Sequence, residues 1–229
     1  DTMSESERQA HRERTKAMQA ARDADKAQRQ RQAREAATSR LNKSTHATDD
    51  HPYLQRKGAQ AHGIRAEGGN LLIPMRDTSG KLHSLQVIDA QGEKRFLPGG
   101  RVSGCFYGMG KPDGVLIVVE GFATGASLHE STGHAVAVAF NAGNLKAVAV
   151  DLQAKYPALK LIIAADDDHR TDGNPGLTKA TEAAQAVGGL LVVPDFGADR
   201  PNGATDFNDL HTHHGGAAGL AVVRAQVRA

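Results

Sequence analysis

Short apolar runs alternate with helix-like segments from Gly114 to the end of the chain. Each run is apolar without interruption, which is typical of a strand covered on both faces. Strands are expected at 115–119, 135–140, 161–165 and 190–193, and helices at 123–132, 144–156, 177–187 and 216–228. Strands that alternate with helices in this way predict a mainly parallel, four-stranded sheet flanked by helices.

The preceding segment has a different pattern. Leu71–Ile73 is a short apolar run that Pro74 is expected to end, and Leu82–Ile88 has the composition of a second strand. The turn residues of 77–80 lie between them. We therefore expect a small mixed α+β, strand-rich subdomain at 51–111, followed by an α/β domain at 112–229.

Residues 1–50 form a third region, rich in Arg, Gln, Ala, Glu and Lys. These residue types favour helix. Leu41 is its only Val, Leu, Ile or Phe, so the helix has no apolar stripe with which to pack on a core. The pattern predicts a solvated, charged helical arm or linker, and the alternative is a basic arm that touches phosphate. Because the sequence starts with Asp1 rather than Met, we expect a piece of a longer polypeptide.

Composition and charge narrow the class of protein. The net charge is +2, and residues 51–229 are neutral, with seventeen basic and seventeen acidic side chains, so charge supports nucleic-acid binding only weakly. No apolar run has the length of a membrane span, and no signal peptide is visible. Cys105 is the single cysteine, which excludes an internal disulfide or a cysteine-based zinc site. A cytoplasmic protein without a membrane partner is expected.

Acidic residues follow the predicted strands at the edge where parallel sheets bind ligands. Glu120 comes directly after the first strand, and Asp166 and Asp168 follow the third. Side chains two apart on extended backbone point the same way, so Asp166 and Asp168 can converge while Asp167 faces away. Asp206 follows the fourth strand after a loop and could approach the same rim. Clustered carboxylates are typical ligands of Mg²⁺.

Other acidic and polar residues have simpler interpretations. Asp167, Asp195 and Asp199 are expected to be ordinary solvated or capping residues. The stretch His211–His214 meets no metal-ligand spacing rule and is interpreted as a polar loop. Lys179 could contact phosphate near the acidic edge or lie on the polar face of its helix, and both alternatives stay open.

Three motifs occur in order: Val118-Val119-Glu120-Gly121-Phe122-Ala123-Thr124-Gly125, Ala164-Ala165-Asp166-Asp167-Asp168 and Thr205-Asp206-Phe207-Asn208-Asp209-Leu210. Together they resemble the Toprim domain of bacterial primases, topoisomerases and some nucleases, over about 112–212. The resemblance implies the Toprim fold and makes Glu120 the acid/base or metal-adjacent residue. It also implies that Asp166 and Asp168 bind Mg²⁺, for which Mn²⁺ can substitute, with Glu120 and Asp206 beside them.

The upstream subdomain points to primases within that family. The run Leu72–Asp77 followed by Gly80, and the run Lys94–Pro98, are similar to segments of the basic subdomain of bacterial primases. The resemblance makes Arg76, Lys94 and Arg95 candidates for binding nucleotide or nucleic-acid phosphate, and Lys179 is a further candidate because of its place near the acidic edge. It implies a primase of the conjugative-plasmid or mobile-element type, with single-stranded DNA, ribonucleoside triphosphates and a helicase or relaxase domain as partners.

Two positions depart from the family pattern. Thr124 stands where cellular primases carry an aspartate, and Asn208 stands in place of a second late acidic residue. Both changes remove a carboxylate, so the number of metals is open. The alternatives are a Toprim nuclease that cleaves phosphodiesters and a catalytically degenerate module that binds only DNA or a partner.

Overall fold

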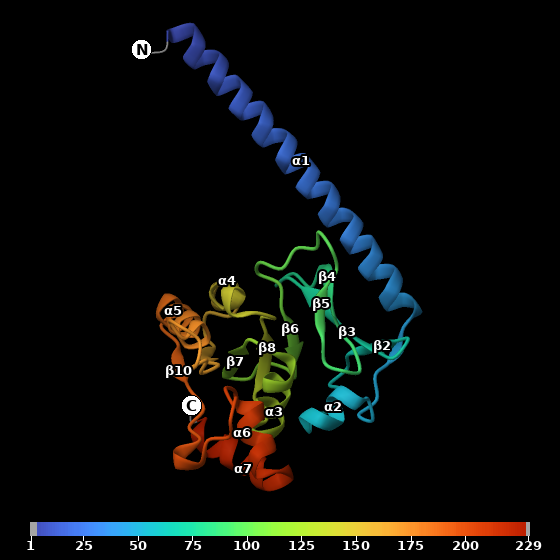
Figure 1. The fold of residues 1–229 in the computed structure, drawn as a ribbon, viewed down its shortest axis with the longest axis vertical. Helices are drawn as coiled ribbons and strands as arrows, with labels where there is room; N and C mark the ends of the chain where they lie inside the picture. Colours follow the sequence, from blue (N-terminus) through green and yellow to red (C-terminus); the bar gives the residue numbers. More distant parts are fainter. Residues whose placement is uncertain (1–3, 228–229) are drawn as a thin grey trace.

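The computed structural model describes residues 4–227 and contains two five-stranded sheets (Figure 1). The first sheet is antiparallel, in the order β1-β2-β3-β4-β5. Its part of the chain comprises α1 (Glu5–Lys43), β1 (Thr45–His46), α2 (Pro52–Lys57), β2 (Arg65–Glu67), β3 (Asn70–Arg76), β4 (Leu82–Ile88) and β5 (Lys94–Phe96). The expected strand-rich subdomain is therefore present.

The second sheet has the order β10-β9-β7-β8-β6. Its elements are β6 (Tyr107–Met109), β7 (Val115–Val119), α3 (Phe122–Thr132), β8 (Ala135–Val138), η1 (Ala142–Asn144), α4 (Leu145–Lys155), β9 (Lys160–Ala164), α5 (Pro175–Val187), β10 (Leu190–Val192), η2 (Gly197–Asp199), α6 (Phe207–His214) and α7 (Gly216–Gln226). The four predicted strands are parallel, which confirms that expectation. The fifth strand, β6, is antiparallel to β8 and comes from the segment before residue 112. The last helix was expected to reach residue 228, which lies outside the described residues.

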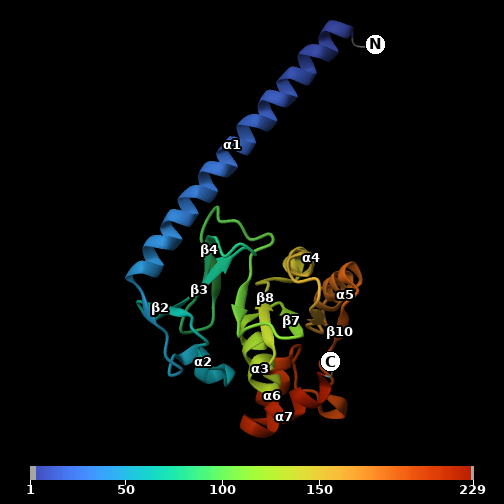
Figure 2. The ribbon, with the colours of Figure 1, turned by 180° about the vertical axis from the view of Figure 1, so that it is seen from behind.

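Helices cover both faces of the second sheet (Figures 1 and 2). One core lies between the sheet and the pair α4 and α5, and the other lies against α3, α6 and α7. Gly125 lets α3 approach closely, because a Cβ there would lie 2.9 Å from a methyl group of Val138. The acidic residues thus follow strands that are fixed from both sides.

The helical arm α1 projects far beyond the rest of the chain (Figure 1). Most of it is exposed, as expected, but its last turns pack on the first sheet. Ala33 and Ala37 are buried, and Ala37 joins Leu72 and Leu85 in a small core. The prediction that the arm cannot pack was wrong for this part, because small alanines at helical spacing let the helix approach the sheet without a stripe of large apolar residues.

Two local predictions also need correction. β3 continues through Pro74, which pairs with Leu85 of β4. Proline is tolerated because β2 pairs β3 only as far as Leu72, so no neighbour on that side needs an amide from Pro74. Asn144 precedes α4 but does not cap it with its side chain. Its buried amide accepts from the Gly104 amide at 2.8 Å and donates to the Cys105 carbonyl at 2.9 Å, so it ties the segment before β6 to the loop after β8.

Within residues 4–227, no helix is both long enough and apolar enough to cross a bilayer.

Candidate metal and phosphate site

Glu120 follows β7 and lies on the rim between the two sheets. Its carboxylate accepts a hydrogen bond from the Ala142 amide in the loop after β8. Burial raises the pKa of Glu120, and the nearby charge of Asp168 raises it further, whereas Lys94 acts in the opposite direction. The side chain is only partly exposed. A glutamate held in this way is suited to taking or giving a proton.

Asp166 is a strongly perturbed carboxyl of the rim. Its pKa is raised to about 9, first by burial and then by the charges of Asp206, Glu120 and Asp168. Its Oδ1 atom is buried and has no hydrogen-bond partner among the described residues. Three acidic neighbours therefore act on the same group, and the structure brings these four side chains towards one rim.

Asp167 points away from the rim, as the alternation of side chains predicts. Its Oδ2 forms an ion pair of 2.6 Å with Arg200, and its Oδ1 accepts from the Asn174 amide at 2.7 Å. The hydrogen bond from Arg200 keeps the pKa of Asp167 below its usual value. Two adjacent aspartates therefore have opposite environments, one structural and satisfied, the other crowded by like charge.

Asp206 reaches the rim from the start of α6. Its Oδ1 accepts from the Asp209 amide at 2.8 Å, so it also caps the helix. Burial and the charge of Asp209 raise its pKa, and the Thr124 hydroxyl, which donates to its carboxylate, acts against this. Thr124 thus occupies the site as a hydrogen-bond donor rather than as an additional acid.

Asn208 lies outside the site. Its buried amide donates to the Lys57 carbonyl at 2.7 Å and to the Ser127 hydroxyl at 3.0 Å. The side chain therefore joins α6 to α2 and α3. Because Asn208 points away from the rim, an aspartate at this position would not belong to the group of carboxylates there.

The donor set fits a hard divalent cation. Four carboxylates influence one another, and one oxygen of Asp166 is buried without a hydrogen-bond partner among the residues described. Within residues 4–227, no group of three His, Cys, Asp or Glu side chains forms a ready-made metal cage. Mg²⁺ commonly takes one or two protein carboxylates and completes its shell with waters and substrate phosphates. Asp166 and Asp168 could hold such an ion, with Glu120 and Asp206 beside it.

The four basic candidates lie in different environments. Lys94 faces the acidic rim, where it lowers the pKa of both Glu120 and Asp166. Arg76 donates to the Gly80 carbonyl at 2.9 Å in its own hairpin, and Arg95 lies 3.5 Å from Asp89. Lys179 pairs with Glu182 on the exposed face of α5. Among the described contacts and charge effects, only Lys94 of these four acts on the carboxylates of the rim.

The comparisons identify the second sheet and its helices. Residues 115–217 match the sequence model of a family described as the Toprim domain. That span includes Glu120, Asp166, Asp168 and Asp206. Residues 115–217 form a Toprim domain.

Two curated relatives, both from Escherichia coli, are each named DNA primase TraC. One is 42% identical over 193 residues, covering 77% of this chain and 18% of the relative, and the other is 45% identical over 157 residues, covering 63% and 11%. The chain thus spans less than a fifth of each relative.

Solved structures with the same fold include primases. The primase fragment of the bacteriophage T7 primase-helicase protein has a TM-score of 0.55 at 16% identity, over 75% of this chain and 71% of that one. The DnaG primase catalytic domain bound to single-stranded DNA has a TM-score of 0.50 at 15% identity, over 73% of each chain. At these identities the likeness shows the fold alone.

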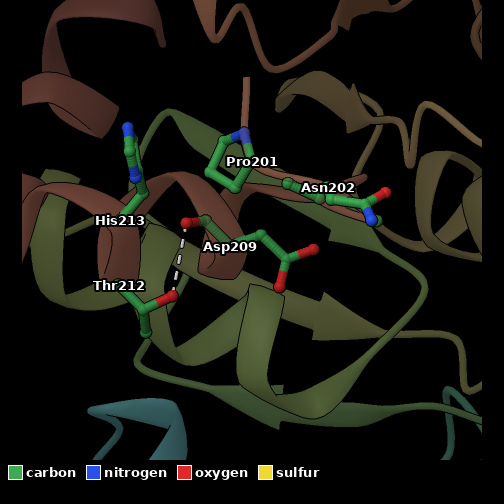
Figure 3. Close-up of a pocket in the computed structure, with 7 residues that line it drawn as sticks. Pro201, Asn202, Asp209, Thr212 and His213 are labelled. Atoms are coloured by element: carbon green, nitrogen blue, oxygen red, sulfur yellow. Dashed lines mark hydrogen bonds between the residues drawn. The ribbon is translucent and has the colours of Figure 1, made fainter. Parts of the chain in front are cut away.

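A hollow elsewhere on the Toprim domain lies between the 201–204 loop and α6 (Figure 3). Asp209, Thr212 and His213 line its helical side, and the Thr212 hydroxyl donates to the Asp209 carbonyl at 3.2 Å (Figure 3). None of Glu120, Asp166 and Asp168 lines it, so the acidic rim is a separate site. The stretch 211–214 is the end of α6 rather than the expected loop.

Three features of the Toprim site were missed from the sequence. The Gly176 amide donates to Asp168 Oδ2 at 3.0 Å, and a Cβ on Gly176 would lie 2.5 Å from the Asp166 carbonyl oxygen. Lys57 of α2 lies 3.8 Å from Asp209 across the subdomain boundary. The Ala142 amide holds Glu120. The glycine in the 173–176 turn was the one available signal, but its pairing with Asp168 depends on the fold.

Proposed function

We propose that this chain is the catalytic core of a DNA primase, which synthesises RNA primers on a single-stranded DNA template by a metal-dependent reaction. The observation that carries the proposal is the Asp166 carboxylate, whose buried Oδ1 has no partner within residues 4–227 and which three other carboxylates surround. Such an arrangement favours binding of a cation and of the phosphates that accompany it. The TraC relatives, which are named DNA primases, support the choice of reaction.

Three carboxylates of the rim, together with Lys94, have proposed roles in phosphoryl transfer. The 3′-hydroxyl of the growing primer attacks the α-phosphate of the incoming ribonucleoside triphosphate, the bond between the α- and β-phosphates breaks, and pyrophosphate leaves. Glu120, with its raised pKa, is suited to receive the hydroxyl proton. Lys94 binds phosphate as a point charge from the opposite wall. A divalent cation held by Asp166 and Asp168 would neutralise charge that develops on the transferring group.

The biological setting follows from the relatives and stays a proposal. The motifs resemble those of primases from conjugative plasmids and mobile elements, so the primers would serve plasmid replication or transfer. Single-stranded DNA and ribonucleoside triphosphates are the proposed substrates. A helicase or relaxase domain, in the same polypeptide or another, is a proposed partner.

A primer-synthesis assay separates this function from its rivals. The chain is incubated with Mg²⁺, labelled ribonucleoside triphosphates and single-stranded DNA, and the products are resolved by length. Short RNA products that require template support a primase, and degradation of DNA without synthesis supports a Toprim nuclease. If the chain shows no synthesis, no degradation of DNA and no binding of Mg²⁺ or Mn²⁺, the result supports a degenerate binding module.

Matched variants give the assay its specificity. Glu120→Gln is expected to lower synthesis by about 10²-fold or more, as loss of one acid–base group does. Glu182→Gln is the control, because this glutamate lies on the exposed face of α5 and pairs only with Lys179 among the described contacts. Equal activity of Glu120→Gln and wild type would remove Glu120 from the mechanism.

A further inference from the structure

The strand that carries Lys94 also carries an exposed aromatic residue on the same face. Lys94 and Phe96 are two residues apart on β5, so their side chains point the same way. Arg95 lies between them and pairs with Asp89 and Glu93 at 3.5 and 3.8 Å. A contact that holds Phe96 in place therefore also holds β5, and with it the position of Lys94 above the rim.

The contact of Phe96 lies in the loop that holds Glu120. The rings of Phe96 and Phe140 meet edge to face, with centroids 6.3 Å apart and planes at 85°. Phe140 is a buried, non-glycine residue with a φ of 75°, a conformation that side chains seldom adopt. Its amide donates to the Glu120 carbonyl at 2.8 Å, and two residues later the Ala142 amide donates to the Glu120 carboxylate.

Backbone and ring of Phe140 thus act in two directions. The left-handed turn directs the loop so that its amides reach Glu120, and the ring extends to the other subdomain and contacts Phe96. The Lys94 Nζ is 3.9 Å from the point that a Cβ on Gly121, the neighbour of Glu120, would occupy. The contact between Phe96 and Phe140 therefore connects β5, which carries Lys94, to the loop after β8, whose amides hold Glu120.

We propose that Phe96 and Phe140 are positioning residues that set Lys94 opposite Glu120, and so align phosphate binding with the acidic rim. The expected effect on nucleotide binding rests on the proposed function. The alignment of Lys94 with Glu120 does not depend on that function. Neither phenylalanine needs to touch substrate. A glycine at 140 would allow the same left-handed turn without the ring, which separates the backbone role from the aromatic contact.

Zero-length cross-linking measures the alignment without any enzyme activity. A carbodiimide activates a carboxyl group, and a lysine amine within contact distance then forms an amide with it. Peptide mass spectrometry should find Lys94 joined to Glu120 or another rim carboxylate in the full chain. Phe96→Ala and Phe140→Gly should each lower that yield several-fold. Phe96→Tyr, which keeps the ring, should restore it.

Two controls show whether the effect is local. The cross-link between Lys57 and Asp209, which are 3.8 Å apart across the same boundary, should keep its yield in every variant that folds. Leu191→Ala removes a side chain as exposed as Phe96, at 37%, from the far edge strand β10 and should leave the Lys94 cross-link unchanged. An unchanged Lys94 yield in both Phe96→Ala and Phe140→Gly would overturn the proposal.

Kinetics then test the consequence for nucleotide binding. In primer synthesis, Phe96→Ala and Phe140→Gly should raise the KM for ribonucleotides several-fold with a smaller change in kcat, and Lys94→Ala combined with Phe96→Ala should be no worse than Lys94→Ala alone. A uniform fall in kcat at constant KM would indicate only a loss of folded protein and would contradict positioning. A wild-type chain that shows the cross-link but no synthesis would refute the primase and leave the alignment intact.

Discussion

Replacing Asp166 by Asn should stabilise the metal-free protein. The carboxylate is buried among Glu120, Asp168 and Asp206, and its Oδ1 has no hydrogen-bond partner in the part of the chain that the structure describes. Its pKa is raised from 3.8 to about 9, so the folded state keeps it protonated at neutral pH. Keeping that proton at pH 7 lowers the free energy of unfolding by about 1.4 kcal/mol for each pH unit above the ordinary pKa of 3.8, which gives about 4 kcal/mol as an upper limit. An uncharged amide of the same shape avoids the cost.

The net gain will be smaller, because the rim can relax and neighbouring carboxylates share the proton. We expect Asp166→Asn to be more stable by about 1–3 kcal/mol in chelator, which raises the Tm by about 3–10 °C for a chain of this size. The measurement is thermal unfolding followed by circular dichroism at pH 7. Mg²⁺ should raise the Tm of the wild type more than that of the variant, because a ligand stabilises the state that binds it.

The pH dependence has a defined sign. A carboxyl with a pKa raised in the folded state binds more protons than the unfolded chain, so stability falls as pH increases between the two pKa values. The metal-free wild type should therefore lose stability from about pH 4 to about pH 9, the range set by Asp166. The Asp166→Asn variant should show a shallower decline over the same range.

Asp167→Asn is the matched control and should act in the opposite direction. The neighbouring carboxylate pairs with Arg200 at 2.6 Å, and loss of a charged hydrogen bond of this kind costs about 1.5–3 kcal/mol. An Asp166→Asn variant that is no more stable than the wild type in chelator, or that loses stability as Asp167→Asn does, would refute the picture of a crowded, unsatisfied rim.

Three further substitutions test the supports of the site. Gly176→Ala places a Cβ 2.5 Å from the Asp166 carbonyl oxygen and should weaken Mn²⁺ binding measured by calorimetry, whereas Gly108→Ala, with only ordinary contacts, should not. Asn208→Asp buries a charge against the Lys57 carbonyl and should lower stability by about 2–4 kcal/mol in urea unfolding, without improving metal binding. Asn144→Ala removes buried hydrogen bonds to the segment before β6 and to the end of β8, and should cost about 2–4 kcal/mol in the same assay; a loss under 1 kcal/mol would contradict that role.

Much of the α/β architecture could be predicted from the apolar pattern. Continuous apolar runs identified the four parallel strands, because strands covered on both faces contain few polar residues. The acidic rim was predictable for a related reason: Glu120 and Asp166 come just after such runs, at the edge where strands end together. Alternation then separated Asp167 from its neighbours.

Contacts between distant segments could not be predicted in this way. The short strand β6 joins the second sheet although it precedes residue 112. This pairing could not be predicted, because the three residues of β6 carry too weak a pattern to indicate a partner strand. The role of Asn144 as a link to the segment before β6 depends on the amide of Gly104, forty residues away. The packing of Ala37 and the contact of Phe96 with Phe140 arise only when separate elements meet.

Calorimetric titration with Mn²⁺ tests most directly whether residues 120, 166 and 168 act as one cation-binding rim. The wild type should bind Mn²⁺, and Glu120→Gln, Asp166→Asn and Asp168→Asn should each weaken or abolish the heat of binding. Asp167→Asn should bind like the wild type, because its carboxylate faces Arg200 instead. Binding that survives all three rim substitutions, or that is lost in Asp167→Asn alone, would contradict the account.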